Sequence, residues 1–387
     1  LHPFDFSLYL LNGTPQFSHL LFFLTLLSAL AFASGFRTRL TGFVTWFLLA
    51  SLQLRNPKVL EGADQIMTLT LFWFVCAECL NRRKEPILAN AGTALLLCQV
   101  VFIYFFSAIH KVATPEWWQE ADAVWLAIRK QFGADSSFLN FFLIRPSLCA
   151  FLTRGSLILE FAAPLLLLAP HRIIRSVGVF LFVCFHVSIA LLLGHVFFSA
   201  VSLIALTPFV RRKGVPFQRA QPAQLPLFLI AVAILGFLNL KGLTELPWQK
   251  PLNALAHTLK VTQGWVMYAS ISRGYTWDEI RGRTEDGTLT NTHPFRLAFN
   301  SEPRSLAQGF GNRHWYLYIN AVRDSNSNAP LLAFGRYICR KYNSSVPVGR
   351  RLDEFEWLSV SRNIDRAGNL TPIAHEPLWQ HNCLERL

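Results

Sequence analysis

The chain of 387 residues is 52% hydrophobic and 14% aromatic, but only 15% of its residues are charged, and its formal net charge is +13. Soluble domains carry about 25% charged residues, so this composition excludes an ordinary soluble protein and indicates one that crosses a membrane several times. The basic residues lie mainly in short loops between apolar segments and in the C-terminal third, which counts against nucleic-acid binding.

Apolar runs of spanning or near-spanning length predict about eight transmembrane helices. We place them near residues 17–34, 40–54, 65–80, 87–109, 148–169, 173–194, 196–210 and 226–240. The second, third, seventh and eighth runs are short for a full crossing, and helix tilt or shelter by neighbours would accommodate them. The chain begins with Leu1 instead of methionine, so we expect a processed or truncated start.

The loops between these runs alternate in charge. Every even-numbered loop is balanced or lacks lysine and arginine, whereas the odd-numbered loops are basic and carry Arg37 and Arg39; Arg82, Arg83 and Lys84; His171, Arg172 and Arg175; and Arg211, Arg212, Lys213 and Arg219. The positive-inside rule then places the basic loops in the cytoplasm. Residues 1–16, the loop with Lys111 and everything after about residue 241 would lie outside a cytoplasmic (inner) membrane.

No spanning run follows residue 240, which predicts two domains. Residues 1–240 would form a transmembrane helical bundle, and residues 241–387 a small extracytoplasmic α+β domain, so the fold class is mainly α. Residues 117–132 have the spacing of an amphipathic helix, which would lie on the outer membrane surface or pack against the bundle.

Short patterns predict the elements of the outer domain. The segment 285–288 (EDGT) has the composition of a hairpin turn. Residues 315–319 and 355–360 have the pattern of strands, and residues 331–342 that of a short helix. Two cysteines of this domain, Cys339 and Cys383, could form a disulfide if the domain is extracytoplasmic.

Ionisable residues in apolar runs are the candidate functional residues, because burying a charge without a partner is costly. Glu160 lies within LILEFAAPLLLLAP, His186 lies in the middle of its run, and Lys111 lies at the end of QVVFIYFFSAIHK. Tyr104 is seven residues before Lys111 and therefore shares its helix face. Lys111, Arg154 or His186 could be the partner of Glu160.

Each candidate has a structural and a chemical interpretation. Lys111 is either a lysine that extends to the membrane interface or a desolvated amine that acts as a base. Glu160 is either a tether between helices or part of a site. His186 is either a neutral histidine bonded to a neighbouring helix or a catalytic group.

Several familiar catalytic and metal patterns are missing from the sequence. Cys76 and Cys79 form a CxxC motif, but neither a second cysteine pair nor a nearby histidine pair completes a metal site, so we expect none. GxSxG, HExxH, P-loop and GxGxxG motifs do not occur in a supporting context, so hydrolase, zinc-protease and nucleotide-driven functions have no positive support.

Several short motifs occur in a consistent order along the chain. They are SLQLRNPKVLEGAD, IYFFSAIHK followed by a tryptophan pair, LILEFAAPLLLLAP, CFHVSIALLLG, and QGWVMYAS with EDGTLTN. Together they resemble the HTTM-domain membrane proteins, which include vitamin K-dependent gamma-glutamyl carboxylase and many bacterial relatives. In that family another span usually precedes the region where this chain begins.

The resemblance implies a chemistry. The carboxylase deprotonates reduced vitamin K with a lysine, oxygen converts the quinol to an epoxide, and the base formed on the way removes a glutamate γ-proton before CO2 adds. In the family's Y-F-I-A-G-x-K-K run, Lys111 matches the second lysine and Tyr104 the tyrosine, and His186 resembles its intramembrane histidine. The resemblance thus implies Lys111, His186 and Tyr104 as catalytic residues.

The implied ligand is a reduced quinone, such as menaquinol or vitamin K hydroquinone, held near Tyr104, Lys111 and Glu160. The segment 55–57 (RNP) stands where the carboxylase has N-N-H, and the outer domain is shorter than the carboxylase's. These departures count against glutamate carboxylation and leave quinol deprotonation as the expected chemistry.

Two functions remain as hypotheses. The first is a membrane enzyme that binds or oxidises a quinol at an outward-facing site, with Lys111 as the base. The second is a non-catalytic scaffold or maturation partner for an exported peptide, which residues 241–387 would bind. A transporter would depend only on Glu160 and His186, and the sequence has no internal repeat of the kind that many transporters show.

Overall fold

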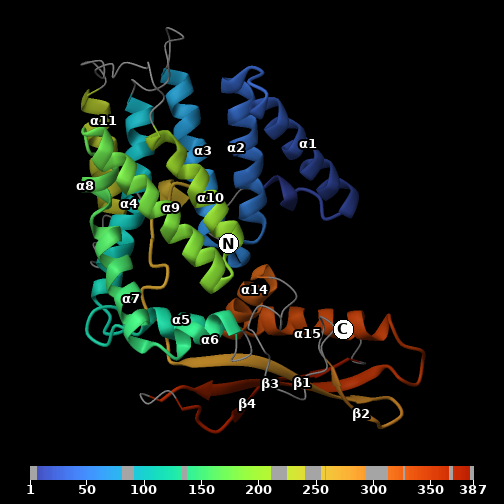
Figure 1. Cartoon of the computed structure of the whole chain (residues 1–387). Helices are drawn as coiled ribbons and strands as arrows, with labels where there is room; N and C mark the ends of the chain where they lie inside the picture. The colour runs from blue at the N-terminus through green and yellow to red at the C-terminus, as the bar shows by residue number, and fades with distance from the viewer. Residues whose placement is uncertain are drawn as a thin grey trace. The chain divides into compact units, whose positions relative to one another are not determined.

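The computed structural model describes residues 7–80, 91–132, 137–210, 225–239, 254–257, 259–292, 313–325, 327–365 and 369–383 (Figure 1). The chain forms two compact units. The first contains Leu1–Ala121 and Phe151–Ser270, and the second contains Asp122–Ala150 and Ile271–Leu387. The domain boundary that we expected between residues 240 and 241 lies outside the described residues.

The first unit is built from apolar helices, and a helix occupies each of the eight apolar runs. They are α1 (Pro15–Ala33), α2 (Thr38–Arg55), α3 (Gly62–Leu80), α4 (Ala91–Val112), α7 (Pro146–Phe161) with α8 (Ala163–Leu167), α9 (Arg172–Leu193), α10 (Val196–Leu206) and α11 (Leu225–Asn239). Among the described helices, α1, α3, α4 and α9 are long and apolar enough to cross a membrane. Helix α6 (Ser137–Leu143) and α7 would be a fifth span if this bent pair is one crossing. The expected count of about eight spans stays a prediction.

Helix α4 is the most buried of these four long apolar helices. Of the residues in its most apolar stretch, 67% are buried inside the protein, whereas the corresponding shares are 22% for α9 and 6% for α1. It packs against α3, α8 and α11, and it contributes Val100, Val101, Ile103, Tyr104 and Phe106 to the apolar core. Any side chain on the inner face of α4 is therefore surrounded by protein.

The second unit combines a sheet with short helices. Its elements are α5 (Ala123–Phe132), α6 (Ser137–Leu143), β1 (Gly274–Thr284), β2 (Leu289–Thr292), α14 (Arg313–Arg323), α15 (Asn328–Asn343), β3 (Leu352–Asn363) and β4 (Ala374–Asn382). The strands form one antiparallel sheet in the order β2-β1-β3-β4. Helices α14 and α15 lie against this sheet (Figure 1). The core between them includes Ile319, Phe334, Ile338, Phe355 and Trp357.

Most of the elements expected in this unit are confirmed. The EDGT segment is the turn of the β1–β2 hairpin, where Gly287 has a φ of +80° that favours glycine. The segments 355–360 and 331–342 lie in β3 and α15. Cys339 and Cys383 form a disulfide.

Two expectations need correction. The predicted strand 315–319 is wrong, because these residues belong to helix α14, whose Ile319 and Val322 are buried. The alternation of aromatic residues suggested a strand, but the positions that face the core recur at helical spacing. The expected helix over 117–132 begins only at Ala123, since Ala121 has a left-handed backbone with a φ of +54°.

Close packing of α3 against α4 depends on Gly92. An alanine Cβ at this position would lie 2.5 Å from the backbone N and Cα of Ala77. We expect Gly92→Ala to force the helices apart and to destabilise the protein by about 1–3 kcal/mol. Gly155→Ala is the matched control, because a Cβ on that helical glycine meets nothing within 4 Å.

The measurement is the thermal unfolding midpoint of both variants in detergent. A lower midpoint for Gly92→Ala, with an unchanged or higher midpoint for Gly155→Ala, supports the close approach. Equal midpoints for Gly92→Ala and the parent protein would contradict it.

Candidate functional site

A buried ion pair joins α4 to α7. Lys111 lies in the last turn of α4, and Glu160 is the penultimate residue of α7. The Nζ of Lys111 donates hydrogen bonds to both carboxylate oxygens of Glu160, at 2.6 and 2.7 Å. The two side chains are only 5% and 4% exposed. Of the three partners that the sequence allowed for Glu160, the structure pairs it with Lys111.

The other two allowed partners are engaged elsewhere. Arg154 is exposed and donates to the backbone oxygen of Trp118 at 3.4 Å. His186 forms its hydrogen bond with Tyr104. Because the Lys111 side chain is buried against a carboxylate, it does not reach out to a solvent-exposed interface.

An aromatic ring covers the ammonium group of Lys111. Its Nζ lies 4.6 Å from the ring centroid of Trp117, a cation–π distance. The indole N–H of Trp117 donates to the backbone oxygen of Tyr268 at 2.7 Å, which fixes the ring. Thr114 makes a second such bond, from its hydroxyl to the backbone oxygen of Ala269 at 2.6 Å. The lysine is therefore enclosed by its own helix end and by residues far away in the sequence.

The second pair of the site is Tyr104 with His186. The hydroxyl of Tyr104 on α4 lies 2.8 Å from Nε2 of His186 on α9, and both residues are buried. Phe182 packs against Tyr104 with a centroid distance of 4.2 Å and an angle of 36° between the rings. The Nδ1 of His186 is buried and has no hydrogen-bond partner among the described residues. A buried polar atom without a partner is costly, so it marks a place where a ligand hydroxyl or water would be stabilised.

The two pairs lie along one face of α4. Tyr104 and Lys111 are seven residues apart, which is two turns or about 10 Å along the helix axis. Glu160 of α7 bonds to Lys111, and His186 of α9 bonds to Tyr104. The structure therefore brings together the four residues that sequence analysis singled out, from helices α4, α7 and α9.

The sequence did not indicate that the segment 259–270 belongs to the helical unit. Its Gln263 exchanges hydrogen bonds with Gln99 of α4, at 2.9 and 3.0 Å, and its Trp265 is buried. Gln65 of α3 donates to the backbone oxygen of Thr262 at 2.6 Å. An amide such as Gln99 inside an apolar run needs a polar partner, and that need was the one signal in the sequence.

Metal ligands do not gather at this site. Across the ranges that the structure describes, no group of three or more histidine, cysteine, aspartate or glutamate side chains could hold a metal ion. The donors and acceptors at the site are one amine, one carboxylate, one phenol and one imidazole. These groups suit proton transfer and hydrogen bonding to an organic ligand.

Comparisons with known proteins leave the family open. The sequence matches no family model and no solved structure. It is similar to the uncharacterized protein YitO of Bacillus subtilis (strain 168), with 24% identity over 193 residues. That match covers 45% of this chain and 62% of YitO, so the chain spans less than two thirds of that relative. Membership of the HTTM family stays a prediction.

Single and double substitutions in the ion pair distinguish two costs. A single substitution leaves one buried charge without its partner, and the double substitution removes both charges. Lys111→Met leaves the Glu160 carboxylate buried without a partner, and we expect a loss of about 3–5 kcal/mol. Glu160→Leu leaves the ammonium of Lys111 buried without a partner in the same way. The double variant removes both charges at similar volume, and we expect it to recover most of the stability.

Thermal unfolding of the three variants in one detergent tests this expectation. Val112→Ala, at an exposed position next to Lys111, is the control for changes at the end of α4. If the double variant loses as much stability as the sum of the single variants, the two groups are independent and the ion pair is absent.

Proposed function

We propose that this protein is an integral membrane enzyme that binds a reduced quinone and removes a phenolic proton with Lys111. One observation carries the proposal: an amine and a carboxylate share hydrogen bonds while almost fully buried in an apolar helical unit. The resemblance to quinol-using HTTM proteins supports the class of ligand, and the Tyr104–His186 pair on the same face of α4 supports its position.

Lys111 must be neutral to act as a base. A proton can move from its Nζ to a Glu160 oxygen along the 2.6 Å hydrogen bond, which leaves an amine and a carboxylic acid. The ion pair is the resting form, and its apolar surroundings make the neutral pair accessible, because charged groups are costly to keep away from water. The amine then accepts the phenolic proton of the quinol, so that an ammonium stands beside a quinolate anion.

His186 and Tyr104 would orient the ligand. The Nδ1 of His186, which has no partner among the described residues, can donate to or accept from a quinol hydroxyl, depending on the tautomer of the ring. Its Nε2 keeps the bond to Tyr104. Dioxygen would be the oxidant that the resemblance implies. One of its oxygen atoms enters the quinone epoxide, and the other leaves as water with the two hydroxyl hydrogens of the quinol.

A scaffold function is the alternative, and the same ion pair supports it. A buried lysine with two hydrogen bonds to a carboxylate is also a tether that fixes α4 against α7. In that case the bundle would hold the second unit at the membrane, and this unit would bind an exported peptide.

We also propose that the protein lies in the cytoplasmic membrane, crosses it about eight times, and carries its C-terminal unit on the outer side. The alternation of basic loops supports the orientation. The Cys339–Cys383 disulfide supports it independently, because disulfides persist in oxidising compartments.

The orientation predicts that Cys339 and Cys383 are oxidised in the native membrane. Membranes would be treated with an alkylating reagent under denaturing conditions, with and without prior reduction, and analysed by mass spectrometry. We expect alkylation of this pair only after reduction, whereas Cys149, a free cysteine, reacts in both samples. Alkylation of Cys339 and Cys383 without reduction would remove this support for an outer location.

The quinol proposal is tested in lipid nanodiscs with a short-chain menaquinol as the probe. We expect the parent protein to consume oxygen and to form the quinone epoxide, which chromatography detects. The Lys111→Met, Glu160→Leu double variant should stay folded and lose this activity by at least about 100-fold, the usual contribution of a general base. Val112→Ala should match the parent protein.

The double variant separates the two functions, because it keeps the unit folded without the base. Full activity in this variant would contradict the role of Lys111. A parent protein that neither binds nor oxidises the quinol would contradict the enzyme and favour the scaffold.

A further inference from the structure

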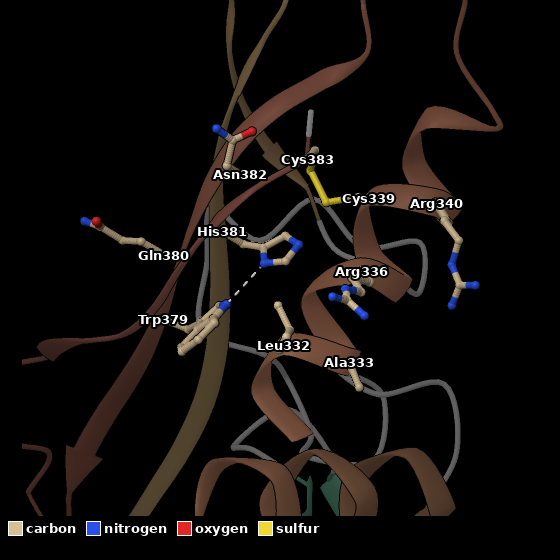
Figure 2. Close-up of a pocket in the computed structure, with 10 residues that line it drawn as sticks. All are labelled: Leu332, Ala333, Arg336, Cys339, Arg340, Trp379, Gln380, His381, Asn382 and Cys383. Atoms are coloured by element: carbon tan, nitrogen blue, oxygen red, sulfur yellow. Dashed lines mark hydrogen bonds between the residues drawn. A yellow bond between two sulfur atoms is a disulfide. The ribbon is translucent and has the colours of Figure 1, made fainter. Parts of the chain in front are cut away.

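A pocket of about 610 Å³ lies in the second unit, between α15 and β4 (Figure 2). Its volume falls within the range of small-molecule sites, roughly 300–1,000 Å³. Helix α15 contributes Arg336 and Arg340, and strand β4 contributes Trp379 and His381. The pocket lies wholly within one unit and does not involve the Lys111 site.

Among the residues that the structure describes, the pocket carries positive charge without a counter-charge. Arg336 and Arg340 are four residues apart and therefore lie on the same face of α15. None of the ten described residues that line the pocket is acidic. Within the described parts of the chain, neither guanidinium has an ion-pair or hydrogen-bond partner. A concave surface concentrates the field of such charges and attracts anions.

The opposite wall offers an aromatic ring and an ordered imidazole. The indole N–H of Trp379 donates to Nδ1 of His381 at 3.4 Å, so a neutral His381 carries its hydrogen on Nε2. The imidazole packs closely over Gly335 of α15, where an alanine Cβ would lie 2.8 Å from the ring. The flat face of Trp379 suits an aromatic or aliphatic group of a ligand.

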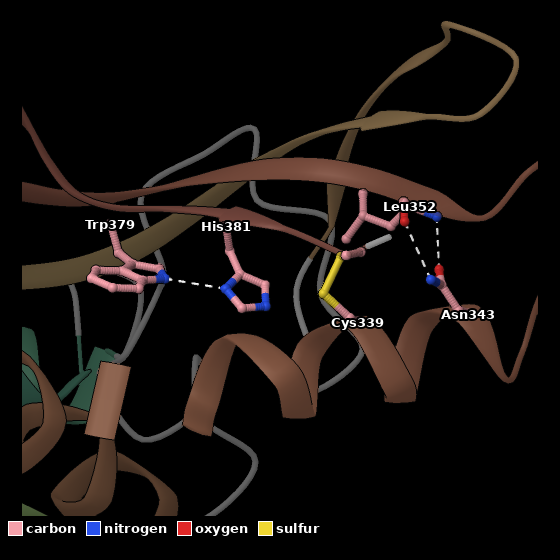
Figure 3. Close-up of a disulfide and its surroundings, with 6 residues drawn as sticks. Cys339, Asn343, Leu352, Trp379 and His381 are labelled. Carbon is pink, nitrogen blue, oxygen red and sulfur yellow. Dashed lines mark hydrogen bonds between the residues drawn. A yellow bond between two sulfur atoms is a disulfide. The ribbon is translucent and has the colours of Figure 1, made fainter. Parts of the chain in front are cut away.

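A disulfide fixes the two walls relative to each other. Cys339 of α15 and Cys383, just after β4, both line the pocket, and their Cα atoms are 5.5 Å apart. Figure 3 shows the disulfide at Cys339. At the end of the same helix, Asn343 exchanges hydrogen bonds with the backbone of Leu352, at 2.7 and 3.2 Å. The arginines are thus held on a preformed frame, which lowers the entropic cost of binding.

We propose that this pocket binds a small organic oxyanion, a molecule with a flat apolar body and a phosphate or carboxylate group. The planar guanidinium groups of Arg336 and Arg340 match the geometry of such oxyanions and bind them with paired hydrogen bonds. The apolar body lies against Trp379 and Leu332, which also line the pocket. Phosphate and carboxylate share this chemistry, and the choice of probe distinguishes them.

The test is isothermal titration calorimetry of the full-length protein in detergent with phenyl phosphate and benzoate, and with phenol as the neutral probe. We expect one of the two anions to bind and phenol not to bind. Arg336→Gln and Arg340→Gln should each weaken that binding at least about tenfold, the usual effect of losing a charged hydrogen bond. Lys341→Gln removes the same charge from an exposed position of α15 outside the pocket and should leave the affinity unchanged.

Each result decides the proposal. The anion that binds more tightly identifies the oxyanion. The difference in affinity between phenyl phosphate and inorganic phosphate gives the contribution of the apolar body to the binding free energy. Both arginines are exposed, so their replacement leaves the fold intact, which near-ultraviolet circular dichroism verifies. Absence of binding in the parent protein, or equal weakening by Lys341→Gln and the two arginine variants, would overturn the proposal.

Discussion

The buried ion pair between Lys111 and Glu160 is the interaction on which the helical unit and its proposed chemistry both depend. Two charges that are 5% and 4% exposed are tolerated only because each satisfies the other. Their hydrogen bonds tie the end of α4 to the end of α7. The pair therefore fixes the geometry of the unit. It also places an amine and a carboxylate in apolar surroundings, where desolvation of charged groups costs free energy.

The surroundings of the pair show how the fold isolates it. Trp117 covers the ammonium, and the segment 259–270 holds Trp117 through the backbone oxygen of Tyr268. The same segment is anchored to α4 by the reciprocal amide bonds of Gln99 and Gln263. Because these contacts join residues up to 164 positions apart, enclosure of Lys111 is a property of the whole helical unit and not of its own helix.

The sequence predicted the helices far better than the partners. Apolar runs located every long helix of the first unit, because burial in an apolar environment leaves a strong compositional signal. Glu160 was recognised as an anomaly, yet three partners were possible, since helix packing and not local sequence decides which side chains meet. The segment 315–319 was misassigned because a short aromatic pattern fits both a strand and a helix face. The segment 259–270 has no periodic pattern, and its place follows only from long-range hydrogen bonds.

Solid-state NMR of the protein in lipid bilayers tests the central claim most directly. The measurement is the dipolar coupling between the side-chain nitrogen of Lys111 and the carboxyl carbon of Glu160, each labelled with a magnetic isotope. Our account predicts a strong coupling, and a lysine nitrogen whose protons exchange slowly with bulk water. A coupling too weak to detect, with fast exchange at that nitrogen, would mean that the pair does not form in the membrane.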